Sequence, residues 1–587
     1  MIYLGIHGGH NASAALMRDG KIIFALQEER FTNLKNFYGY PFQSVKHCLD
    51  YVKSKKLIID IAAIATIEDY LFFHKYRFNN FFSIPDFHKY YSVSLSQKKA
   101  ISFVMNHKKS KNNKGFYLPF QKINKKNYFN INYRRDIFIE QLKKQGKHNI
   151  KKITFLDHHT CHAYYSYFSA KNRKENSCVV AVDSYGDKAN QTVWVVKRNK
   201  LQLVAKTDQF EIARIYKFIT LILNMKPEEH EFKVMGLSAY SKKKFILDVY
   251  EKVFKKIQKF DGIKIVHNKR PKNLYLYLKE ATKDFRFDNI AGGLQYFVEQ
   301  LMKELLIRIY KKYKIKNFYF SGGVSMNVKM YNNLGKLSFV DFLYSPPSGS
   351  DESLSIGACY YLSQHIKTYP LNNIYLGKNL ISKSVKLNLE YIKKQFSKKD
   401  YKILSNFNHK DLASLLVNNQ IIAVARDREE FGARALGNRS IIANPSNYGV
   451  VQSINESIKN RDFWMPFALT ILKESHKKYI DNKKNFECNY MTMSFDTNKN
   501  NFNKIKAGCH PYDKTVRPQI LDKNSNPKYY SIIKQFSKKT GIPALLNTSL
   551  NLHGNPMASS LSQVISTFKK SGLKYLYLND NFLIKKK

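Results

Sequence analysis

The chain has 587 residues, too many for one hydrophobic core, so we expect at least two domains. Hydrophobic residues make up 44% of the sequence, which excludes a chain that is disordered throughout. The formal net charge of +53, from 98 Lys and Arg against 45 Asp and Glu, indicates either anionic partners or the Lys-rich composition that A/T-rich coding produces.

The N-terminal segment and the cysteines bear on location. The sequence starts with MIYLGIHGGH, a strand and a glycine turn, and lacks the regions of a signal peptide. No apolar run reaches the roughly 18 residues of a membrane-spanning helix. The six cysteines show no disulfide-like spacing and no CxxC pair. These features predict a reducing, cytoplasmic location.

Two segments of the first half of the chain repeat one pattern. Residues 2–27 are predicted to form a strand, a Gly-Gly turn and two further strands joined at Asp19-Gly20. The pattern returns about 180 residues later, in SCVVAVDSYGD and the two strands after it. Such a duplication predicts an α/β fold of the actin-like type, which holds a nucleotide between two lobes.

Two further turns precede helices. After an aromatic, basic insertion at about 67–150, predicted to be irregular and partly helical, KNFYFSGGVSMNVKM predicts a strand, a Gly-Gly turn and a helix. Backbone N–H groups of such a turn suit a phosphate or a nucleoside. YSPPSGSDESLSIGACYYL then predicts a loop and a helix of small residues, with Asp351 and Glu352 near its first turn.

A second α/β unit follows. We divide the chain into an N-terminal domain over 1–370, a connector over 371–405 and a C-terminal domain over 406–587. In the last, DLASLLVNNQIIAVARD predicts a helix and a strand that lead into a loop rich in Arg and Gly. The segment PALLNTSLNLHGNPM predicts a strand followed by a polar loop.

The stretch DHHTCHA at 157–163 is a candidate metal site. On a helix, His158 and His162 are one turn apart and present both imidazoles on one face. Further ligands are needed, and Asp183 and Asp351, which follow core strands, can supply carboxylates. Two His and one or two carboxylates suit Fe(II), Mn or Zn with open positions for substrate oxygens.

Two other interpretations of DHHTCHA stay open. It could be a surface helix start capped by Asp157 with exposed imidazoles, which is the commoner meaning of an isolated HxxxH. A nucleophilic role for Cys161 is less favoured, because small buried thiols are common in cores.

The loop RDREEFGARALGNRS is a candidate anion site. Guanidinium groups bind phosphate or carboxylate with two parallel hydrogen bonds, and glycines allow close backbone approach. The loop and two nearby segments offer these cations: Arg426, Arg428, Arg434, Arg439, Lys459, Arg461, Lys514 and Arg517. Asn438 and Ser440 add neutral donors. Such a set suits a polyanion such as ATP with a second phosphate; the alternative is a solvated basic face.

Eight motifs resemble one family in order along the whole chain. They are GGHNASAALMRDG…EERFTNLKN, DHHTCHA, EFKVMGLSAY, FSGGVSMN, PPSGSDESLSIGA, EFGARALGNRSI, KNRDFWMPFA and NTSLNLHGNPM. Together they resemble the O-carbamoyltransferases typified by nodulation and antibiotic-tailoring enzymes. The resemblance implies an α/β protein with a duplicated actin-like, Kae-like N-terminal domain and a C-terminal YrdC-like domain.

The resemblance also implies a reaction. ATP, bound with Mg, and carbamoyl phosphate give carbamoyl-adenylate in the C-terminal domain, and the N-terminal domain transfers the carbamoyl group to a hydroxyl. The implied ligands of a divalent metal, usually iron, are His158, His162, Asp183 and Asp351. The N-terminal nucleotide is implied to lie against Glu231, Lys233, Gly236, Gly322, Gly323 and Asn327, with His10, Asn11 and Lys35 on the acceptor side. ATP and carbamoyl phosphate are implied to bind Arg434, Arg439, Ser440, Lys459, Arg461, Arg517, Asn547 and Ser549.

The chain departs from the family pattern at two positions. Ala433 replaces the usual Pro and leaves the following arginine in place. Asn11 stands where many members have Asp and cannot act as a base. His10 is therefore the better candidate for the general base, since a neutral imidazole accepts a proton near neutral pH.

Two alternative functions remain. An enzyme of the same architecture could modify a nucleic-acid base, which the net charge favours, although no RRM, zinc-finger or helix-turn-helix pattern is present. A non-catalytic sugar- or nucleotide-binding protein is less favoured, because the histidine pair and the arginine loop are intact. Hydroxyls of a sugar, an antibiotic, a lipid-linked glycan or a nucleoside all fit as the acceptor.

Overall fold

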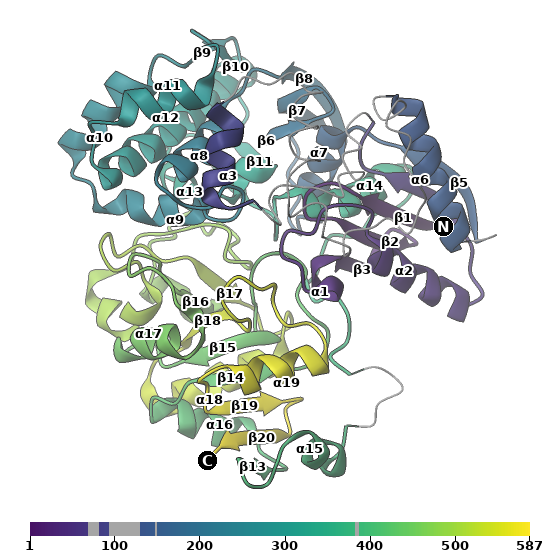
Figure 1. The fold of residues 1–587 in the computed structure, drawn as a ribbon. Coiled ribbons are helices and arrows are strands. Elements are labelled where there is room, and N and C mark those ends of the chain that lie inside the picture. The colour runs from purple at the N-terminus through teal and green to yellow at the C-terminus, as the bar shows by residue number, and fades with distance from the viewer. Residues whose placement is uncertain (68–81, 93–129, 147–148, 382–386) are drawn as a thin grey trace. The chain divides into compact units, whose positions relative to one another are not determined.

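The computed structural model describes residues 1–67, 82–92, 130–146, 149–381 and 387–587 (Figure 1). The chain forms two compact units. The N-terminal unit comprises Met1–Glu28 and Asn36–Pro370, and the C-terminal unit comprises Glu29–Lys35 and Leu371–Lys587. An early segment of the chain, which includes helix α1 (Glu29–Thr32), therefore belongs to the C-terminal unit.

The N-terminal unit contains two five-stranded sheets of equivalent strand order. The first runs β3 (Lys21–Gln27), β2 (Ser13–Arg18), β1 (Ile2–His7), β4 (Ile59–Ile64) and β5 (Ile150–Phe155). The second runs β8 (Lys200–Thr207), β7 (Ala189–Lys197), β6 (Ser177–Gly186), β11 (Asn317–Ser321) and β12 (Phe342–Tyr344). In each sheet an antiparallel three-stranded meander continues into two parallel strands. The predicted repeat is confirmed as a duplicated topology.

The hairpins of the two sheets use the same kind of turn. Asp19 and Gly20 join β2 to β3 with φ of 49° and 75°, and Asp187 and Lys188 join β6 to β7 with φ of 47° and 61°. Two-residue turns with positive φ match the right-handed twist of the flanking strands. The Asp-Gly turn is the favoured sequence, whereas Asp-Lys is unusual there, so tertiary contacts have to hold the second turn.

Helix α14 (Leu354–Leu362) packs between strand β1 and helix α7 (His158–Ser169). Glycines permit this approach: a Cβ on Gly5 would lie 1.8 Å from the carbonyl oxygen of Ser355, and a Cβ on Gly357 would lie 1.9 Å from that of Cys161. The backbones therefore touch directly, which brings the start of α14 close to the start of α7.

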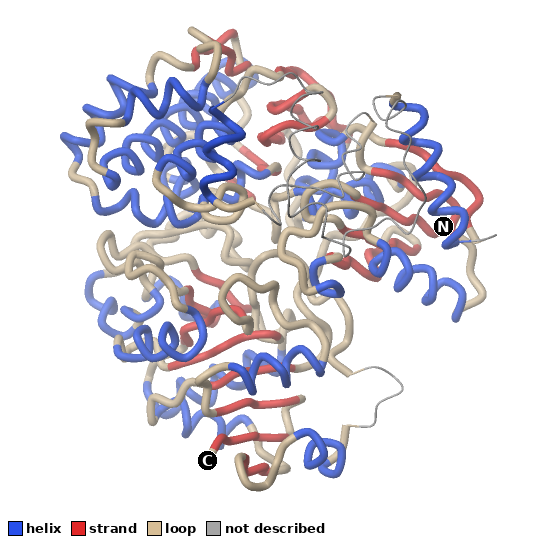
Figure 2. The backbone as a smooth tube through the Cα atoms, viewed as in Figure 1, coloured by secondary structure: helices blue, strands red, loops and turns tan. Residues whose placement is uncertain are grey.

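The remaining helices of this unit are α2 (Phe42–Ser54), α3 (Ile84–Ser92), α6 (Ile131–Gly146), α8 (Ile212–Ile222), α9 (Glu231–Leu237), α10 (Lys243–Val249), α11 (Leu274–Thr282), α12 (Phe287–Tyr313) and α13 (Val328–Gly335). Of these, α2, α6 and α8 contact the sheets and others pack on one another. Helices α3 and α8–α13 pack on one another, next to the hairpin of β9 (Gln258–Asp261) and β10 (Lys264–His267) (Figure 2). The described part of the predicted insertion holds α3 and α6, and the rest of it lies outside the described residues.

The C-terminal unit contains an eight-stranded mixed sheet. Its order is β13 (Tyr401–Leu404), β20 (Phe582–Lys586), β19 (Tyr575–Leu578), β14 (Ile422–Ala425), β15 (Arg439–Ala443), β18 (Ala544–Ser549), β16 (Ala468–Leu472) and β17 (Pro518–Leu521). Its helices include α15 (Leu389–Gln395), α16 (His409–Val417), α17 (Gly449–Ile454), α18 (Pro527–Thr540) and α19 (Leu561–Lys570). Helix α15 and strand β13 fall within the segment expected to be a connector, and both belong to this unit.

Among the helices of the described residues, none combines the length and the hydropathy that a membrane crossing needs.

Candidate metal centre and arginine site

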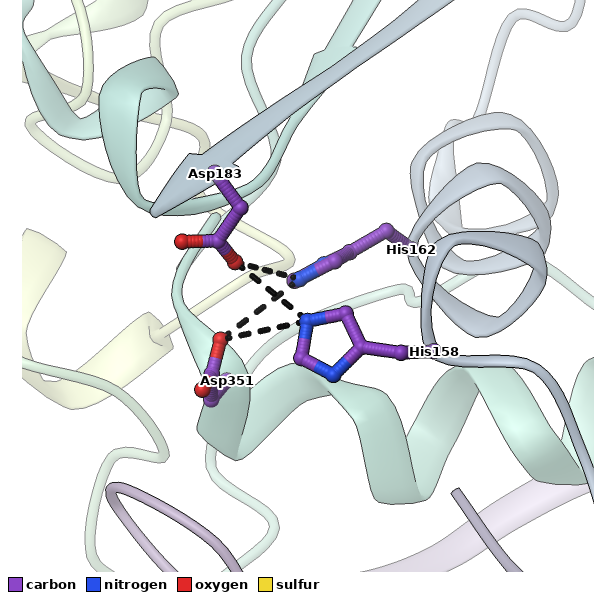
Figure 3. Close-up of side chains that lie close together, drawn as sticks. All are labelled: His158, His162, Asp183 and Asp351. Atoms are coloured by element: carbon purple, nitrogen blue, oxygen red, sulfur yellow. Dashed lines mark hydrogen bonds and ion pairs between the residues drawn. The ribbon is translucent and has the colours of Figure 1, made fainter. Parts of the chain in front are cut away.

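Four side chains of the N-terminal unit point toward one another (Figure 3). The Nε2 atom of His162 lies 3.1 Å from Oδ2 of Asp183, and that of His158 lies 3.4 Å from the same oxygen. The Oδ1 atom of Asp351 lies 3.7 Å from Nε2 of His158 and 3.6 Å from that of His162. Ligands about 2.1 Å from one ion lie about 3–4 Å apart. Two imidazoles and two carboxylates at this spacing fit Fe(II), Mn(II) or Zn(II).

Local sequence and tertiary packing both place the two imidazoles. Asp157 caps helix α7 by accepting a hydrogen bond of 2.8 Å from the backbone N–H of Thr160, as expected. The alternative of exposed imidazoles is wrong, however, because His158 is 4% exposed and His162 is fully buried. Cys161 is also buried, and burial raises the pKa of its thiol well above the usual value, which disfavours a nucleophilic thiolate.

The charges of the cluster favour a bound cation. Burial and the neighbouring carboxylate of Asp183 raise the pKa of Asp351 well above its usual range. For Asp183, hydrogen bonds from His158 and His162 outweigh the effect of burial and hold its pKa well below the usual range. Two buried carboxylates repel each other unless a proton or a cation lies between them. A divalent ion in the cluster would remove this repulsion.

Neighbouring groups orient the cluster. The hydroxyl of Ser321, at the end of β11, lies 3.1 Å from Nδ1 of His162, which leaves Nε2 facing the carboxylates. Gly322 has φ of 87°, and a Cβ there would lie 2.2 Å from the carbonyl oxygen of Val182. A Cβ on Gly323 would lie 3.1 Å from Oδ1 of Asp183. Both glycines thus allow the turn to pack against the end of β6.

Sequence reasoning missed His7, the last residue of β1. Its Nε2 atom lies 3.8 Å from Oδ2 of Asp351 and 3.0 Å from the carbonyl oxygen of His10. Burial and the nearby His158 lower its pKa well below the usual value, so the ring is neutral. Its position at the end of the first core strand was the available signal.

The other predicted residues of the N-terminal unit lie in two places. Glu231, Lys233 and Gly236 share helix α9. Burial raises the pKa of Glu231 to about 7, and its Oε1 accepts a hydrogen bond from the backbone N–H of Glu228. Asn327 caps helix α13, and its Nδ2 group donates to Oε1 of Gln295 at 2.8 Å. Its amide therefore has protein partners on both sides.

The acceptor-side residues are divided between the units. The Nδ2 group of Asn11 donates to the hydroxyl of Ser350, next to Asp351, at 3.3 Å. Asn11 has φ of 57°, a conformation that Asn tolerates well. His10 and Asn11 therefore border the cluster. Lys35, in contrast, belongs to the C-terminal unit, where its charge helps to lower the pKa of Lys459.

Three arginines of the C-terminal unit lie close enough to repel one another. Burial and the charge of Arg434 lower the pKa of Arg461 to about 10. Burial, Arg434 and Arg461 lower the pKa of Arg517 well below its usual value. We call these three residues the arginine trio. Like charges gathered in a desolvated place favour an anionic ligand.

Other predicted residues of this unit surround strands β15 and β18. The Nζ atom of Lys459 is 2.5 Å from the carbonyl oxygen of Ser549 and 2.7 Å from Oδ1 of Asn551. Burial, Arg461 and Lys35 hold its pKa well below the usual value. Asn547 donates to Thr470 at 3.1 Å, and the hydroxyl of Ser440 accepts from the backbone N–H of Gly437 at 2.9 Å.

Arg439 differs from its expected role as a phosphate-binding fork. Its side chain is fully buried. Among the described residues, the guanidinium donates to the backbone carbonyls of Ser559 at 3.0 Å, Asn438 at 2.9 Å, Asp427 at 3.1 Å and Arg426. These contacts engage Nε, Nη1 and Nη2 and hold the loop together. The composition of the loop suggested a ligand site, but composition does not show in which direction a side chain points.

Comparison with known families covers both units. A family model described as Carbamoyltransferase N-terminus matches residues 3–360, and one described as Carbamoyltransferase C-terminus matches residues 413–586. A Methanocaldococcus jannaschii protein, MJ1051, is 30% identical over 99% of this chain and 99% of its own. The nodulation protein NolNO of Sinorhizobium fredii is 23% identical over 100% of this chain and 83% of its own.

Solved structures are similar over part of the chain. HypF in its phosphate- and nucleotide-bound form matches 62% of this chain and 55% of its own, with 12% identity and a TM-score of 0.32. Component A of (R)-2-hydroxyglutaryl-CoA dehydratase from Acidaminococcus fermentans matches 62% of this chain and 97% of its own, with 13% identity and a TM-score of 0.33. The family matches, in contrast, span both units, and the chain belongs to the carbamoyltransferase family.

Proposed function

We propose that the chain is an ATP-dependent O-carbamoyltransferase with a metal centre in an actin-like, Kae-like N-terminal domain and an adenylate-forming site in a YrdC-like C-terminal domain. The observation that carries this proposal is the cluster of His158, His162, Asp183 and Asp351 in a carbamoyltransferase chain. The arginine trio supports the assignment of the two reaction steps to different units, because it is a separate cationic site in the C-terminal unit.

The first step is assigned to the C-terminal unit. Carbamoyl phosphate loses its phosphate to water, and an oxygen of the resulting carbamate attacks the α-phosphorus of ATP, which releases pyrophosphate. Both substrates are anionic and repel each other, and the arginine trio offsets this repulsion. The product, carbamoyl-adenylate, is a mixed anhydride with a good leaving group.

The second step is assigned to the N-terminal unit. The acceptor hydroxyl attacks the carbamoyl carbon, the bond to the AMP oxygen breaks, and His10 takes the hydroxyl proton. A divalent ion held by the four-ligand cluster would supply Lewis acidity toward the carbamoyl oxygen or the phosphate. Ser321 keeps the imidazole of His162 in place, and burial of the cluster limits hydrolysis of the anhydride.

The first test is an ATP–pyrophosphate exchange assay. We expect exchange that depends on carbamoyl phosphate, and we expect a carbamate ester of mass 43 Da above the acceptor, about one CONH unit, when the protein, ATP and carbamoyl phosphate meet a library of hydroxyl compounds. Absence of exchange with intact metal-loaded protein would refute the proposal. The acceptor class we favour is a small molecule such as a sugar, a natural product or a glycan.

Modification of a nucleic acid is the second candidate, and the net charge of +53 is the observation that favours it. Binding to RNA or DNA would then weaken steeply with salt, with a slope near ~0.9 per phosphate contact for duplex DNA. Carbamoyl transfer to an oligonucleotide, but to no small hydroxyl compound, would decide for this alternative.

A further inference from the structure

We propose that Asp187, in the turn between β6 and β7, is a positioning residue that sets His158 in the metal cluster. The inference rests on the proposed metal site and adds a residue outside the four-ligand set. Asp187 is 5% exposed, so its carboxylate needs protein partners. Asp187 belongs to the turn between β6 and β7, whereas His158 is the first residue of helix α7.

Among the described residues, three donors contact this carboxylate. Its Oδ2 atom accepts from the backbone N–H of His158 at 2.8 Å and from that of Ile67 at 2.8 Å. Its Oδ1 atom accepts from the hydroxyl of Thr66 at 2.9 Å. Asp187 therefore joins the chain after β4 in the first sheet, the β6–β7 hairpin of the second sheet and the first turn of α7.

The backbone of the same hairpin touches the ring of His158. A Cβ on Gly186 would lie 2.3 Å from Cγ and 2.4 Å from Cδ2 of that imidazole. Gly186 thus limits the ring on one side while Asp187 holds the backbone N–H of the same residue. Backbone and ring are both fixed, so Nε2 of His158 keeps its distances to Asp183 and Asp351.

This role differs from ordinary helix capping. Asp157 already caps α7 locally, because its Oδ1 atom accepts hydrogen bonds from the backbone N–H and the hydroxyl of Thr160. The first N–H groups of a helix have no intrahelical partner, so either carboxylate could stabilise α7. Of these two carboxylates, Asp187 is the one that links the backbone of His158, a proposed metal ligand, to the hairpin that follows Asp183. The two carboxylates therefore form a matched pair for an experiment.

The experiment is a titration of metal-free protein with Fe(II), Mn(II) or Zn(II), together with thermal unfolding of the same metal-free samples. For Asp187→Ala we expect metal affinity to fall at least tenfold, since loss of an outer partner of a ligand typically costs about 10–100-fold. For Asp157→Ala we expect a lower Tm and a metal affinity within tenfold of the wild type. Gly186→Ala, which forces the ring aside, should weaken affinity at least tenfold.

Asp187→Asn separates geometry from charge. Its amide oxygen can still accept from the N–H groups of Ile67 and His158, while its NH2 group can donate to the hydroxyl of Thr66. We expect its metal affinity to stay within tenfold of the wild type. If Asp187→Ala does not fold, Asp187→Ser takes its place, since a serine hydroxyl is too short to meet all three donors.

The outcomes are distinct. The proposal is overturned if folded Asp187→Ala or Asp187→Ser binds metal within tenfold of the wild type, if Asp157→Ala weakens metal binding equally, or if Asp187→Asn weakens it more than tenfold. Wild-type protein that binds none of the three ions overturns the metal centre and this inference together. Wild-type protein that binds metal but transfers no carbamoyl group refutes the proposed function and leaves the role of Asp187 intact.

Discussion

The Nε2 atom of His162 lies 3.1 Å from Oδ2 of Asp183, although helix α7 carries one residue and strand β6 the other. Both side chains are at least nine-tenths buried, and Asp351 faces them from the start of the segment leading into α14. The spacing of the histidines is local, but their meeting with two carboxylates depends on the backbone contacts that the glycines of β1 and α14 allow.

Removal of one imidazole should separate the two proposed steps. We expect His162→Ala, and likewise His158→Ala, to bind no metal and to transfer no carbamoyl group, because the remaining three ligands no longer close the site. ATP–pyrophosphate exchange should persist, because the arginine trio is untouched. Metal content by mass spectrometry and the two activity assays measure these effects.

His159→Ala is the matched control for this prediction. His159 is buried on the same helix, but its Nδ1 atom faces the hydroxyl of Thr192, at 3.3 Å, and its ring lies outside the cluster. We expect a loss of stability of about 2–4 kcal/mol with metal still bound. Metal-bound, active His162→Ala would show that the cluster is misassigned.

We expect the arginine trio to lower the stability of the ligand-free protein and to strengthen the binding of anionic substrates. Arg517→Gln removes one of three mutually repelling charges, so the ligand-free protein should gain about 1 kcal/mol in free energy of unfolding. The same variant should lose carbamoyl-phosphate-dependent pyrophosphate exchange by 100-fold or more, about 3 kcal/mol, because a charged partner of phosphate is missing. Lys523→Gln, at an exposed position of the same unit, should change neither quantity. Full exchange activity in Arg517→Gln would refute an anion site here.

We expect Arg439 to contribute mainly to the stability of the C-terminal unit. Arg439→Ala removes this donor from four backbone carbonyls of the C-terminal unit, of which those of Asn438 and Asp427 keep a backbone N–H donor. We therefore expect a loss of about 2–4 kcal/mol in the free energy of unfolding. Arg439→Lys should rescue little of this, because an ammonium has three donors and no planar fork. Denaturant unfolding measures the effect. A stable Arg439→Ala variant that lacks only catalysis would instead support direct contact with substrate.

Glu231 should make stability depend on pH. Burial raises the pKa of its carboxyl to about 7 from an ordinary value near 4.5. The folded state thus favours the protonated acid, and this contribution is complete below about pH 4.5 and is lost as the pH rises through 7. Glu231→Gln mimics the protonated form and keeps an acceptor for Glu228. Its free energy of unfolding should exceed that of the wild type by about 3 kcal/mol at pH 8 and by less than about 1 kcal/mol at pH 5.

Denaturant midpoints across pH 5–8 measure this difference. Glu251→Gln is a suitable control, because Glu251 is exposed and pairs with Lys255 at the end of its own helical segment. Its stability curve should run parallel to that of the wild type. Parallel curves for Glu231→Gln as well would contradict the raised pKa.

Much of the local structure could be predicted from residue patterns. The turn at Asp19-Gly20, the strand of SCVVAVD and the cap at Asp157 follow from short-range backbone and hydrogen-bonding preferences, and the structure has all of them. The shared face of His158 and His162 follows from the helical period in the same way. Asp183 and Asp351 were candidate ligands because they follow core strands, and the family resemblance implied the same two carboxylates.

Only the tertiary structure decided how distant residues meet. Packing places His7 beside Asp351, ties Asp187 to the N–H of His158 and assigns Lys35 to the C-terminal unit. It also turns Arg439 inward, although its loop reads like a phosphate site. Sequence determines what a few neighbouring residues prefer, because those preferences act through local backbone geometry. The direction of a long side chain depends on which distant carbonyls and carboxylates packing brings within reach, and no local pattern encodes that.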